Sequence, residues 1–227
     1  MKPLNDRKQI KMNLFEAKNL SVSVGDKIIL KSLNLSIAAG EIQALLGPNG
    51  SGKSSLAHTV IGYPQYNVTG GEIIYKDQFI NDWPPEKRSL AGLMITHQIP
   101  VNIPGVSVGE YLRLTTSKHH PAPGFRQKLR DVLQKVGLGD DFASRDLDSG
   151  ISGGERKRLE IATVLLHQPE FLILDEIDSG LDVDALKTLS QILKQYLNGN
   201  RSILVISHQE KILEILKPDK AQLISNG

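Results

Sequence analysis

The sequence contains no cysteine among its 227 residues. A chain without thiols can form no disulfide bond and can supply no thiolate ligand to a metal or a cluster. Long hydrophobic runs are absent as well, because no stretch reaches the roughly 18 apolar residues that a membrane-spanning helix requires. The polar, lysine-containing residues 1–13 also lack the apolar core of a signal peptide. We therefore expect a cytoplasmic chain that is not inserted into a membrane and that acts at one, if at all, through a partner.

Charge of one sign does not dominate the chain. The 27 Lys and Arg residues nearly balance the 25 Asp and Glu residues, which gives a formal net charge of +2. Without a dense basic run, this balance does not predict a nucleic-acid partner. The hydrophobic fraction of 40% and the charged fraction of 23% are those of an ordinary globular protein. The length predicts one large domain, or one domain that carries a helical lobe.

Alternation of apolar and polar residues marks the first part of the fold. It runs through residues 20–30 and 33–37, which predicts antiparallel strands with one solvent-exposed face. Residues 42–46 form an apolar strand that leads directly into a glycine-rich loop. The pair Gly70-Gly71 predicts a turn, and residues 72–75 that follow it predict another strand.

The second half alternates predicted helices with short apolar strands. Apolar residues share one face over 127–136, and 155–166 also reads as a helix. The continuous apolar runs at 171–174 and 203–206 are typical of parallel strands that are buried on both faces. Strands that alternate with helices predict an α/β sheet.

The strongest motif lies between the strand at 42–46 and the helix that follows it. It consists of Gly47, Pro48, Asn49, Gly50, Ser51, Gly52, Lys53 and Ser54, followed by Ser55. The pattern is that of a phosphate loop, in which glycines let backbone N–H groups wrap around phosphate oxygens at a helix N-terminus. Lys53 would reach the β- and γ-phosphates of a nucleotide, and the Ser54 hydroxyl would bind Mg²⁺. The alternative is a glycine-rich turn with a solvated lysine.

Two carboxylates end the apolar strand at 171–174. Placing charge at the edge of a hydrophobic core costs free energy, so the position of Asp175 and Glu176 indicates a functional or structural role. Beside a phosphate loop, Asp175 would hold Mg²⁺ through its water shell. Glu176 would then orient or deprotonate the water that attacks the γ-phosphate. The alternative is that the pair caps the next helix.

A third motif consists of Ser152, Gly153, Gly154 and Glu155. Locally it predicts a helix start, with Ser152 as the N-cap and Glu155 in the reciprocal capping-box position. Two glycines at a helix N-terminus also make a second anion site. One chain with two phosphate sites and one Mg²⁺ site suggests that the second serves the nucleotide of a neighbouring chain.

These motifs, in this order along nearly the whole chain, resemble the ATP-binding-cassette (ABC) family. The resemblance implies a P-loop NTPase fold of the ABC type, with a mostly parallel sheet, an antiparallel β subdomain and a helical subdomain. The core would comprise about 13–92 and 151–227, and the helical subdomain about 93–150. It also implies ATP and Mg²⁺ as ligands, and a head-to-tail dimer in which Lys53 and Ser54 of one chain face the Ser152–Gly154 segment of the other.

The resemblance gives roles to residues that the sequence alone would not single out. Gln98 would contact Mg²⁺ and the attacking water, and His208 would contact the γ-phosphate. The loop Ser179-Gly180-Leu181-Asp182 would cross the dimer interface. The other histidines show no metal-ligand spacing. Two departures are visible, since Val24 stands where many members carry an aromatic residue that stacks on adenine, and Glu155 replaces the more general Gln.

A narrower resemblance concerns segments outside the ATP chemistry. Residues 66–71, 98–100, 103–107, 175–186 and 212–219 are similar to SufC-type ATPases of the SUF iron–sulfur cluster assembly machinery. This implies SufB- and SufD-like scaffold proteins as partners and an ATP-dependent homodimer within the complex. The resemblance leads us to expect a final strand and tail, and the sequence stops at Asn226-Gly227, short of them.

Other readings remain open. The chain could be the nucleotide-binding subunit of a membrane transporter, or a regulatory cassette protein acting on ribosomes or DNA repair, which its near-neutral charge disfavours. We expect the apolar segment 99–106 to line a groove that binds a helix of the partner. The alternative is that residues 99–106 simply pack beneath the helical lobe.

Overall fold

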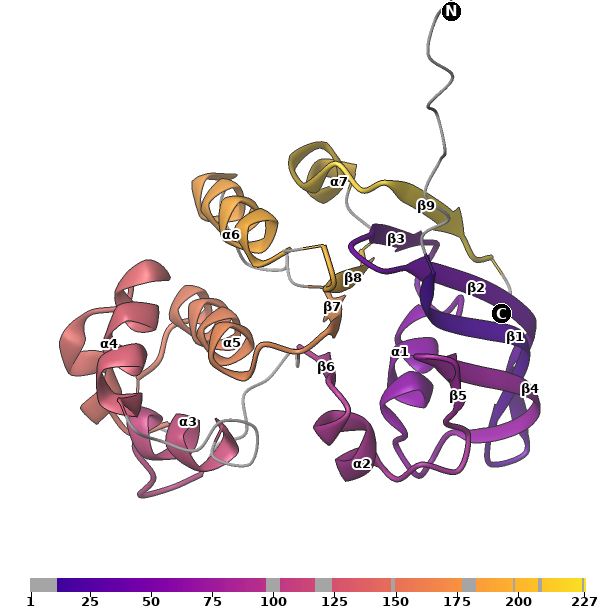
Figure 1. The fold of residues 1–227 in the computed structure, drawn as a ribbon, viewed down its shortest axis with the longest axis horizontal. Coiled ribbons are helices and arrows are strands. Elements are labelled where there is room, and N and C mark those ends of the chain that lie inside the picture. Colours follow the sequence, from indigo (N-terminus) through magenta and orange to yellow (C-terminus); the bar gives the residue numbers. More distant parts are fainter. Residues whose placement is uncertain are drawn as a thin grey trace, which may run out of the picture.

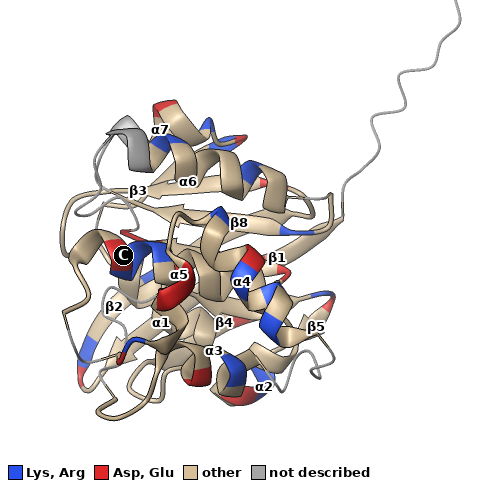
Figure 2. Cartoon of the chain, turned by 90° about the vertical axis from the view of Figure 1, so that its left-hand side faces the viewer, with Lys and Arg blue, Asp and Glu red and all other residues tan. Residues whose placement is uncertain are grey.

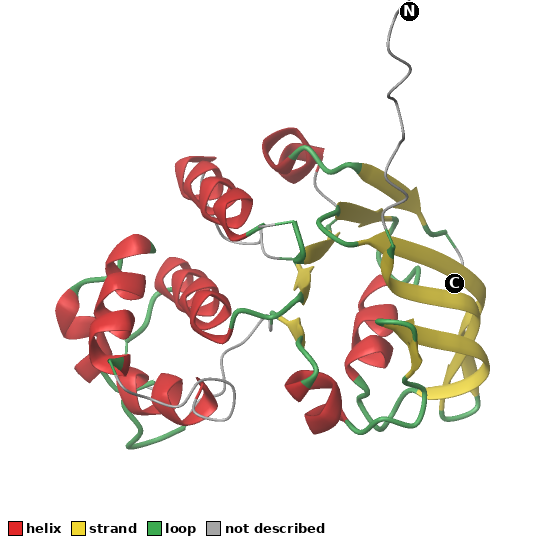
Figure 3. Ribbon diagram, viewed as in Figure 1, coloured by secondary structure: helices red, strands yellow, loops and turns green. Residues whose placement is uncertain are grey.

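The computed structural model describes residues 12–96, 103–116, 124–147, 150–176, 183–197, 199–207, 210–225 and 227. Within these ranges the chain forms a four-stranded sheet of order β2-β1-β4-β5 and a five-stranded sheet of order β6-β7-β8-β3-β9. Helices lie on both sides of the five-stranded sheet (Figure 1), and the antiparallel sheet lies at one side of it (Figure 3). This is the α/β arrangement that the motifs predicted.

The strands are β1 (Asn13–Val24), β2 (Lys27–Ala38), β3 (Ile42–Leu46), β4 (Asn67–Tyr75), β5 (Gln78–Phe79), β6 (Leu93–Ile95), β7 (Phe171–Asp175), β8 (Ser202–Ile206) and β9 (Lys220–Leu223). The helices are α1 (Lys53–Ile61), α2 (Pro85–Leu90), α3 (Val108–Thr116), α4 (Phe125–Lys135), the 3₁₀ helix η1 (Asp140–Ser144), α5 (Gly153–His167), α6 (Val183–Tyr196) and α7 (Glu210–Leu216). In the described ranges no helix combines the length and apolar character of a membrane span; the longest, α5, has 15 residues.

The antiparallel sheet begins with a hairpin of two twelve-residue strands. The alternation over residues 20–30 does not belong to one strand, because a turn at Gly25 and Asp26 divides it between β1 and β2. Gly25 has φ 55°, the left-handed conformation that glycine adopts without a steric penalty. The alternation continues across the turn because Val22 and Leu30 pair with each other and both face the core.

The five-stranded sheet is parallel in all of its pairings, and both of its faces are covered. Phe171 and Ile173 pack toward α1 and the antiparallel sheet. Leu172 and Leu174, on the opposite face, pack toward α5 and α6. Burial on both faces explains why β7 and β8 are continuous apolar runs rather than alternating ones. The prediction for these two strands is confirmed.

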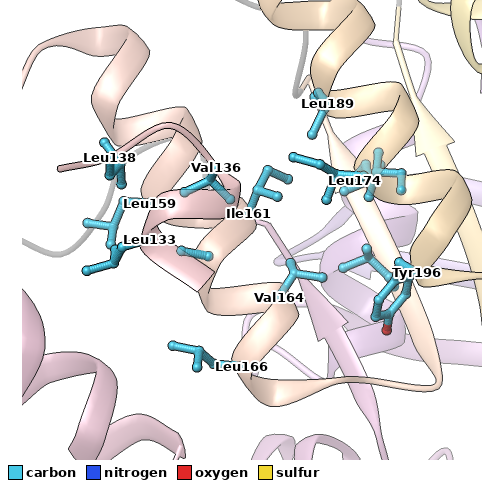
Figure 4. Close-up of a cluster of buried hydrophobic side chains, with 14 of the residues drawn as sticks. Leu133, Val136, Leu138, Leu159, Ile161, Val164, Leu166, Leu174, Leu189 and Tyr196 are labelled. Carbon is cyan, nitrogen blue, oxygen red and sulfur yellow. The ribbon is translucent and has the colours of Figure 1, made fainter. Parts of the chain in front are cut away.

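The helical layer shares its core with the sheet. Figure 4 shows side chains of α4 and α5, such as Leu133 and Ile161, in one cluster with Leu174 of β7 and Leu189 of α6. The expected boundary at residue 93 falls at the start of β6, which pairs with β7 in the parallel sheet. The chain therefore enters the helical layer only beyond this strand. Because α5 belongs to both the layer and the sheet face, the two parts are packed as one body.

Candidate functional site

The phosphate loop lies between β3 and α1, where the motif required it. Gly47 and Gly52 have φ values of 155° and 103°. A Cβ atom on Gly47 would lie 2.1 Å from the carbonyl oxygen of Ile224, and one on Gly52 would lie 2.7 Å from a methyl carbon of Leu30. At Gly47 the blocking atom is backbone and cannot turn aside, and the positive φ at both positions disfavours any residue with a side chain.

The first turn of α1 is open to an anion. Its N-cap, Gly52, has no side chain, and the first turn contains no acidic residue. The free N–H groups of this turn and the helix dipole therefore favour negative charge at this end. Lys53 adds a cation, since its Nζ donates hydrogen bonds to the carbonyl oxygens of Gly47 (2.7 Å) and Pro48 (2.9 Å). The loop thus holds the ammonium group beside its own backbone N–H groups.

The remaining loop residues are divided between core and solvent. Pro48, Asn49 and Gly50 are exposed, and Ser54 and Ser55 are half-buried. Ser51 is 3% exposed, and its Oγ has no hydrogen-bond partner among the described protein atoms. A buried hydroxyl without a partner is costly. A ligand with several acceptor oxygens, such as a nucleotide phosphate, fits this loop.

Ser54 in the first turn of α1 contacts Asp175 at the end of β7, so the structure brings two separate sequence motifs together. The Ser54 hydroxyl donates to Oδ1 of Asp175 at 3.2 Å, although the residues are 121 positions apart in sequence. Asp175 is the last residue of β7 and is 4% exposed. Burial raises the pKa of its carboxyl group, while the hydrogen bond from Ser54 opposes this. A hydroxyl and a carboxylate side by side are ligands that Mg²⁺ prefers, so the residues fit that ion.

Thr96 completes the end of β7 and was not singled out by the sequence. Its Oγ1 accepts a hydrogen bond from the backbone N–H of Asp175 (3.2 Å) and donates to the carbonyl oxygen of Ile173 (3.4 Å). The side chain thereby extends the β6–β7 ladder by one position after β6 has ended at Ile95. The only sequence signal is its place after a strand, two residues before Gln98.

Glu176 follows directly on this strand and has a left-handed backbone with φ 50°. Its N–H donates to the carbonyl oxygen of Ile206 at 3.0 Å, which fixes this conformation. A non-glycine residue in this region costs about 1–3 kcal/mol and persists only where its surroundings hold it. The side chain is half-buried at the carboxyl end of the sheet, so the arrangement can present a base there.

The capping box at the start of α5 is confirmed. The Ser152 hydroxyl accepts from the N–H of Glu155 (3.3 Å), and the N–H of Ser152 donates to Oε2 of Glu155 (2.8 Å). Gly153 and Gly154 differ from Gly47 and Gly52 of the phosphate loop, because a Cβ on either would meet no described atom within 4 Å. Packing against the described residues therefore does not require glycine at these two positions.

The sequence also missed Arg145, which binds this helix start. Its Nη1 lies 2.8 Å from Oε1 of Glu155, and its Nη2 donates to the carbonyl oxygen of Gly150 at 3.0 Å. The bonds from Ser152 and then from Arg145 lower the pKa of Glu155 to about 2. Arg145 follows η1 and has no periodic or motif signal in the sequence.

The phosphate loop and the start of α5 face the same edge of the molecule. A three-residue connection joins α5 to β7, so the helix runs back along the sheet antiparallel to that strand. The N-terminus of α5 consequently lies toward the carboxyl end of β7, as do Asp175 and the phosphate loop. Since α1 and α5 cover opposite faces of the sheet (Figure 1), the two sites are set apart along this edge.

Several expected residues fall outside the part of the chain that the structure describes. These are Gln98, the loop 177–182 with Asp182, and His208. Val24 ends β1 and is half-buried. Of the apolar segment 99–106, residues 99–102 are also outside the described ranges, and Ile103 and Val106 pack against the core cluster of the helical layer. At these two positions the packing alternative is supported.

Comparisons with known proteins agree with this geometry. The profile of the ABC transporter family matches residues 30–179. The probable ATP-dependent transporter ycf16 of Pyropia yezoensis is 39% identical over 222 residues, which cover 94% of this chain and 88% of that protein. The iron–sulfur cluster assembly protein SufC of Plasmodium falciparum is 40% identical over 211 residues, or 89% of this chain and 61% of that protein.

Solved structures show the same fold. An ATP-binding subunit of an ABC transporter aligns with a TM-score of 0.83 and 25% identity, covering 94% of this chain and 87% of that one. A dimeric post-hydrolysis state of an ATP-binding cassette, bound to ADP and phosphate, aligns with a TM-score of 0.81 and 23% identity, covering 94% and 95%. With the family profile and these relatives, the chain belongs to the ATP-binding-cassette family of ATPases.

Proposed function

We propose that this chain hydrolyses MgATP in a head-to-tail dimer and thereby drives conformational change in a SUF-type iron–sulfur cluster assembly complex. The observation that carries the dimer is the pair of glycines at the start of α5. A Cβ atom on Gly153 or Gly154 would meet nothing within 4 Å in the described part of the chain, although glycine lowers helix stability. Their lack of side chains instead allows a phosphate bound to a second copy to approach the helix N-terminus.

Each chain would contribute a different half of each site. Lys53 and the loop N–H groups hold the β- and γ-phosphates, and Ser54, Asp175 and Gln98 hold Mg²⁺, which neutralises charge on the β- and γ-phosphates when bound. Glu176 orients the attacking water and accepts its proton. His208 contacts the γ-phosphate, and Asp182 lies at the interface. The second copy supplies the 152–155 segment opposite that phosphate.

ATP would then act as the bridge between the copies. Its γ-phosphate binds the loop of one chain and the helix start of the other, so the closed dimer is favoured while ATP is intact. Hydrolysis removes the bridging group, and the dimer opens. The free energy available to move a partner is the difference between the free energies of nucleotide binding to the closed and to the open state.

Two observations support SufB- and SufD-like partners. The similarity to the Plasmodium falciparum SufC protein extends over 89% of the chain, well beyond the ATP motifs. A chain without cysteine can drive the assembly of a cluster without competing for it as a thiolate ligand. A second candidate is the nucleotide-binding subunit of a membrane transporter, which is favoured by the similarity to the probable ATP-dependent transporters named ycf16.

The dimer is tested with Glu176→Gln, which keeps the shape of the side chain but cannot accept a proton. With ATP and Mg²⁺ this variant should turn over slowly and accumulate as a dimer in size-exclusion chromatography coupled to light scattering. The matched control is Glu170→Gln, at the opposite end of β7, where the carboxylate pairs with Lys76 at 2.6 Å and is solvent-exposed. The control should hydrolyse ATP like the parent chain. Full activity of Glu176→Gln would assign the base elsewhere.

The partner is tested by a pull-down with SufB- and SufD-like proteins of the same organism, in parallel with a detergent-solubilised permease. Binding to the scaffold proteins supports the cluster-assembly role. Binding to the permease alone would replace it with the transporter role.

A further inference from the structure

The start of α5 contains a charge that a phosphate-binding helix terminus does not favour. Glu155 lies in the first turn, and its carboxylate is ionised throughout the physiological range. The carboxylate stabilises the helix, because it accepts from the N–H of Ser152 and interacts with the positive end of the dipole. It also places a negative charge next to the N–H groups that a γ-phosphate would use.

Arg145 is the cation that faces this carboxylate in the described structure. Its guanidinium binds Oε1 of Glu155 with Nη1 and the Gly150 carbonyl with Nη2, so it holds both sides of the turn that precedes the helix. The same group lies 4.9 Å from the centre of the Phe142 ring. Figure 2 shows acidic and basic residues close together on α5.

The backbone of Arg145 is itself fixed. Its carbonyl oxygen accepts from the N–H of Val108 at the start of α3 (2.9 Å), and the N–H of Leu147 donates to Val106 (3.1 Å). The guanidinium therefore projects from an anchored segment, which lowers the entropy that is lost when it binds the turn.

We propose that Arg145 is a positioning residue for the ATP-dependent dimer: it neutralises the Glu155 carboxylate and fixes the turn at 150–155 so that the partner copy's γ-phosphate can bind the helix start. This inference rests on the proposed dimer. Glu155 has two separable effects, its capping hydrogen bond and its negative charge. The hydrogen bond needs only an acceptor, which the amide of a glutamine could also provide. The negative charge itself is tolerated because Arg145 compensates for it.

The test uses Glu176→Gln as the parent, so that ATP is retained, and measures the dimer dissociation constant with ATP and Mg²⁺ by analytical ultracentrifugation. Arg145→Ala leaves the carboxylate uncompensated. An unfavourable charge at a helix terminus weakens anion binding by up to about fivefold. Both symmetric sites form when the dimer closes, so the dissociation constant should rise by up to about 25-fold. Adding Glu155→Gln to Arg145→Ala should recover most of this loss.

Control variants separate the electrostatic role from simple destabilisation. Arg113→Ala removes an exposed ion pair with Glu110 in α3 (2.7 Å) and should leave dimerisation unchanged. Arg145→Lys keeps the positive charge and should dimerise more tightly than Arg145→Ala. This variant also keeps the inference testable if Arg145→Ala folds poorly. The deficit of Arg145→Ala should also shrink at high salt.

The outcomes are distinct. Dimerisation of Arg145→Ala at the parent's affinity overturns the inference, as does a double variant no better than Arg145→Ala. If the parent itself forms no dimer with ATP, the proposed function fails, and the role of Arg145 fails with it.

Discussion

The Thr96 hydroxyl accepts a hydrogen bond from the backbone N–H of Asp175 at 3.2 Å. Both residues are almost fully buried, so water cannot replace this bond. Removing the hydroxyl leaves the N–H of Asp175 without an acceptor at the position where the strand presents its carboxylate. A buried donor without a partner costs about 1–3 kcal/mol.

Thr96→Val should therefore lower the free energy of unfolding by about 1–2 kcal/mol and raise the Mg²⁺ concentration needed for tight ATP binding. Urea denaturation measures the first effect, and titration of a fluorescent ATP analogue with and without Mg²⁺ measures the second. Thr96→Ser should restore both values. Thr116→Val removes another buried hydroxyl, which donates to the carbonyl oxygen of Leu112 within α3, and should change stability alone. Equal Mg²⁺ dependence in Thr96→Val and Thr116→Val would contradict a positioning role for Thr96.

Lys53 is the cation of the phosphate loop, and its Nζ lies within hydrogen-bond distance of two loop carbonyl groups. Lys53→Ala removes the charge that we propose lies opposite the transferred phosphate, and it should lower the rate of ATP hydrolysis at least about a hundredfold. It should also weaken MgATP binding. The comparison variant is Lys27→Ala, an exposed lysine at the hairpin of the antiparallel sheet. Wild-type turnover in Lys53→Ala would exclude the phosphate-loop assignment.

The sequence predicted those parts of the site whose chemistry lies in consecutive residues. Local patterns marked the glycines and Lys53 of the loop, the capping pair Ser152 and Glu155, and Asp175 at the end of an apolar strand. In each case the structure places the residues where the local pattern put them. The same holds for β7, since burial on both faces leaves a continuous apolar run.

Thr96 and Arg145 could not be found because their partners are distant in sequence or lie in irregular loops. A threonine after a strand looks the same whether its hydroxyl meets Asp175 or solvent. Strand β9 was not predicted from the sequence, for a different reason. It is an edge strand with three exposed residues out of four, so backbone pairing with β3 holds it and no hydrophobic pattern marks it.

Arg88 holds the end of α1 from inside the protein. It is 2% exposed and donates to the carbonyl oxygens of Thr59, Val60, Asn81 and Trp83. Two of these acceptors belong to the last turn of α1, where a cation also interacts favourably with the helix dipole. The helix that begins with Lys53 is thus fixed at the end away from the nucleotide.

Arg88→Met should destabilise the fold by about 3 kcal/mol, because several buried carbonyl groups lose their donor. Arg88→Lys should recover only part, since an ammonium group cannot span the same acceptors. Chemical denaturation gives the stabilities, and ATPase activity per folded molecule should stay near the parent value. Lys87→Met, at the neighbouring position above the Trp83 ring (4.0 Å), should cost less than about 1 kcal/mol. Similar losses in the Arg88 and Lys87 variants would refute this role of Arg88.

Glu160 forms a buried ion pair with Lys157 on α5, 3.3 Å apart. Burial raises the pKa of this carboxyl group to about 7, although Lys157 opposes the shift. The folded protein therefore binds the proton more tightly than the unfolded chain, whose Glu has an ordinary pKa. The stabilisation from this group is complete below the unfolded pKa and is lost as the pH rises through the folded one.

Stability of the parent chain should accordingly include a component that falls between about pH 4.5 and pH 7 by up to about 3 kcal/mol and is constant above that range. Glu160→Gln cannot titrate, so its profile should lack this component, and the two curves should differ in slope between pH 5 and pH 7. Urea denaturation at half-unit intervals of pH measures both curves. Glu110→Gln provides the matched control, because Glu110 also pairs with a cation three residues away but is exposed in α3, where the hydrogen bond from Arg113 lowers its pKa. That control should keep the parent's slope. If Glu160→Gln keeps it too, Glu160 is ionised in the folded protein at acid pH, and Lys157 outweighs the cost of burial.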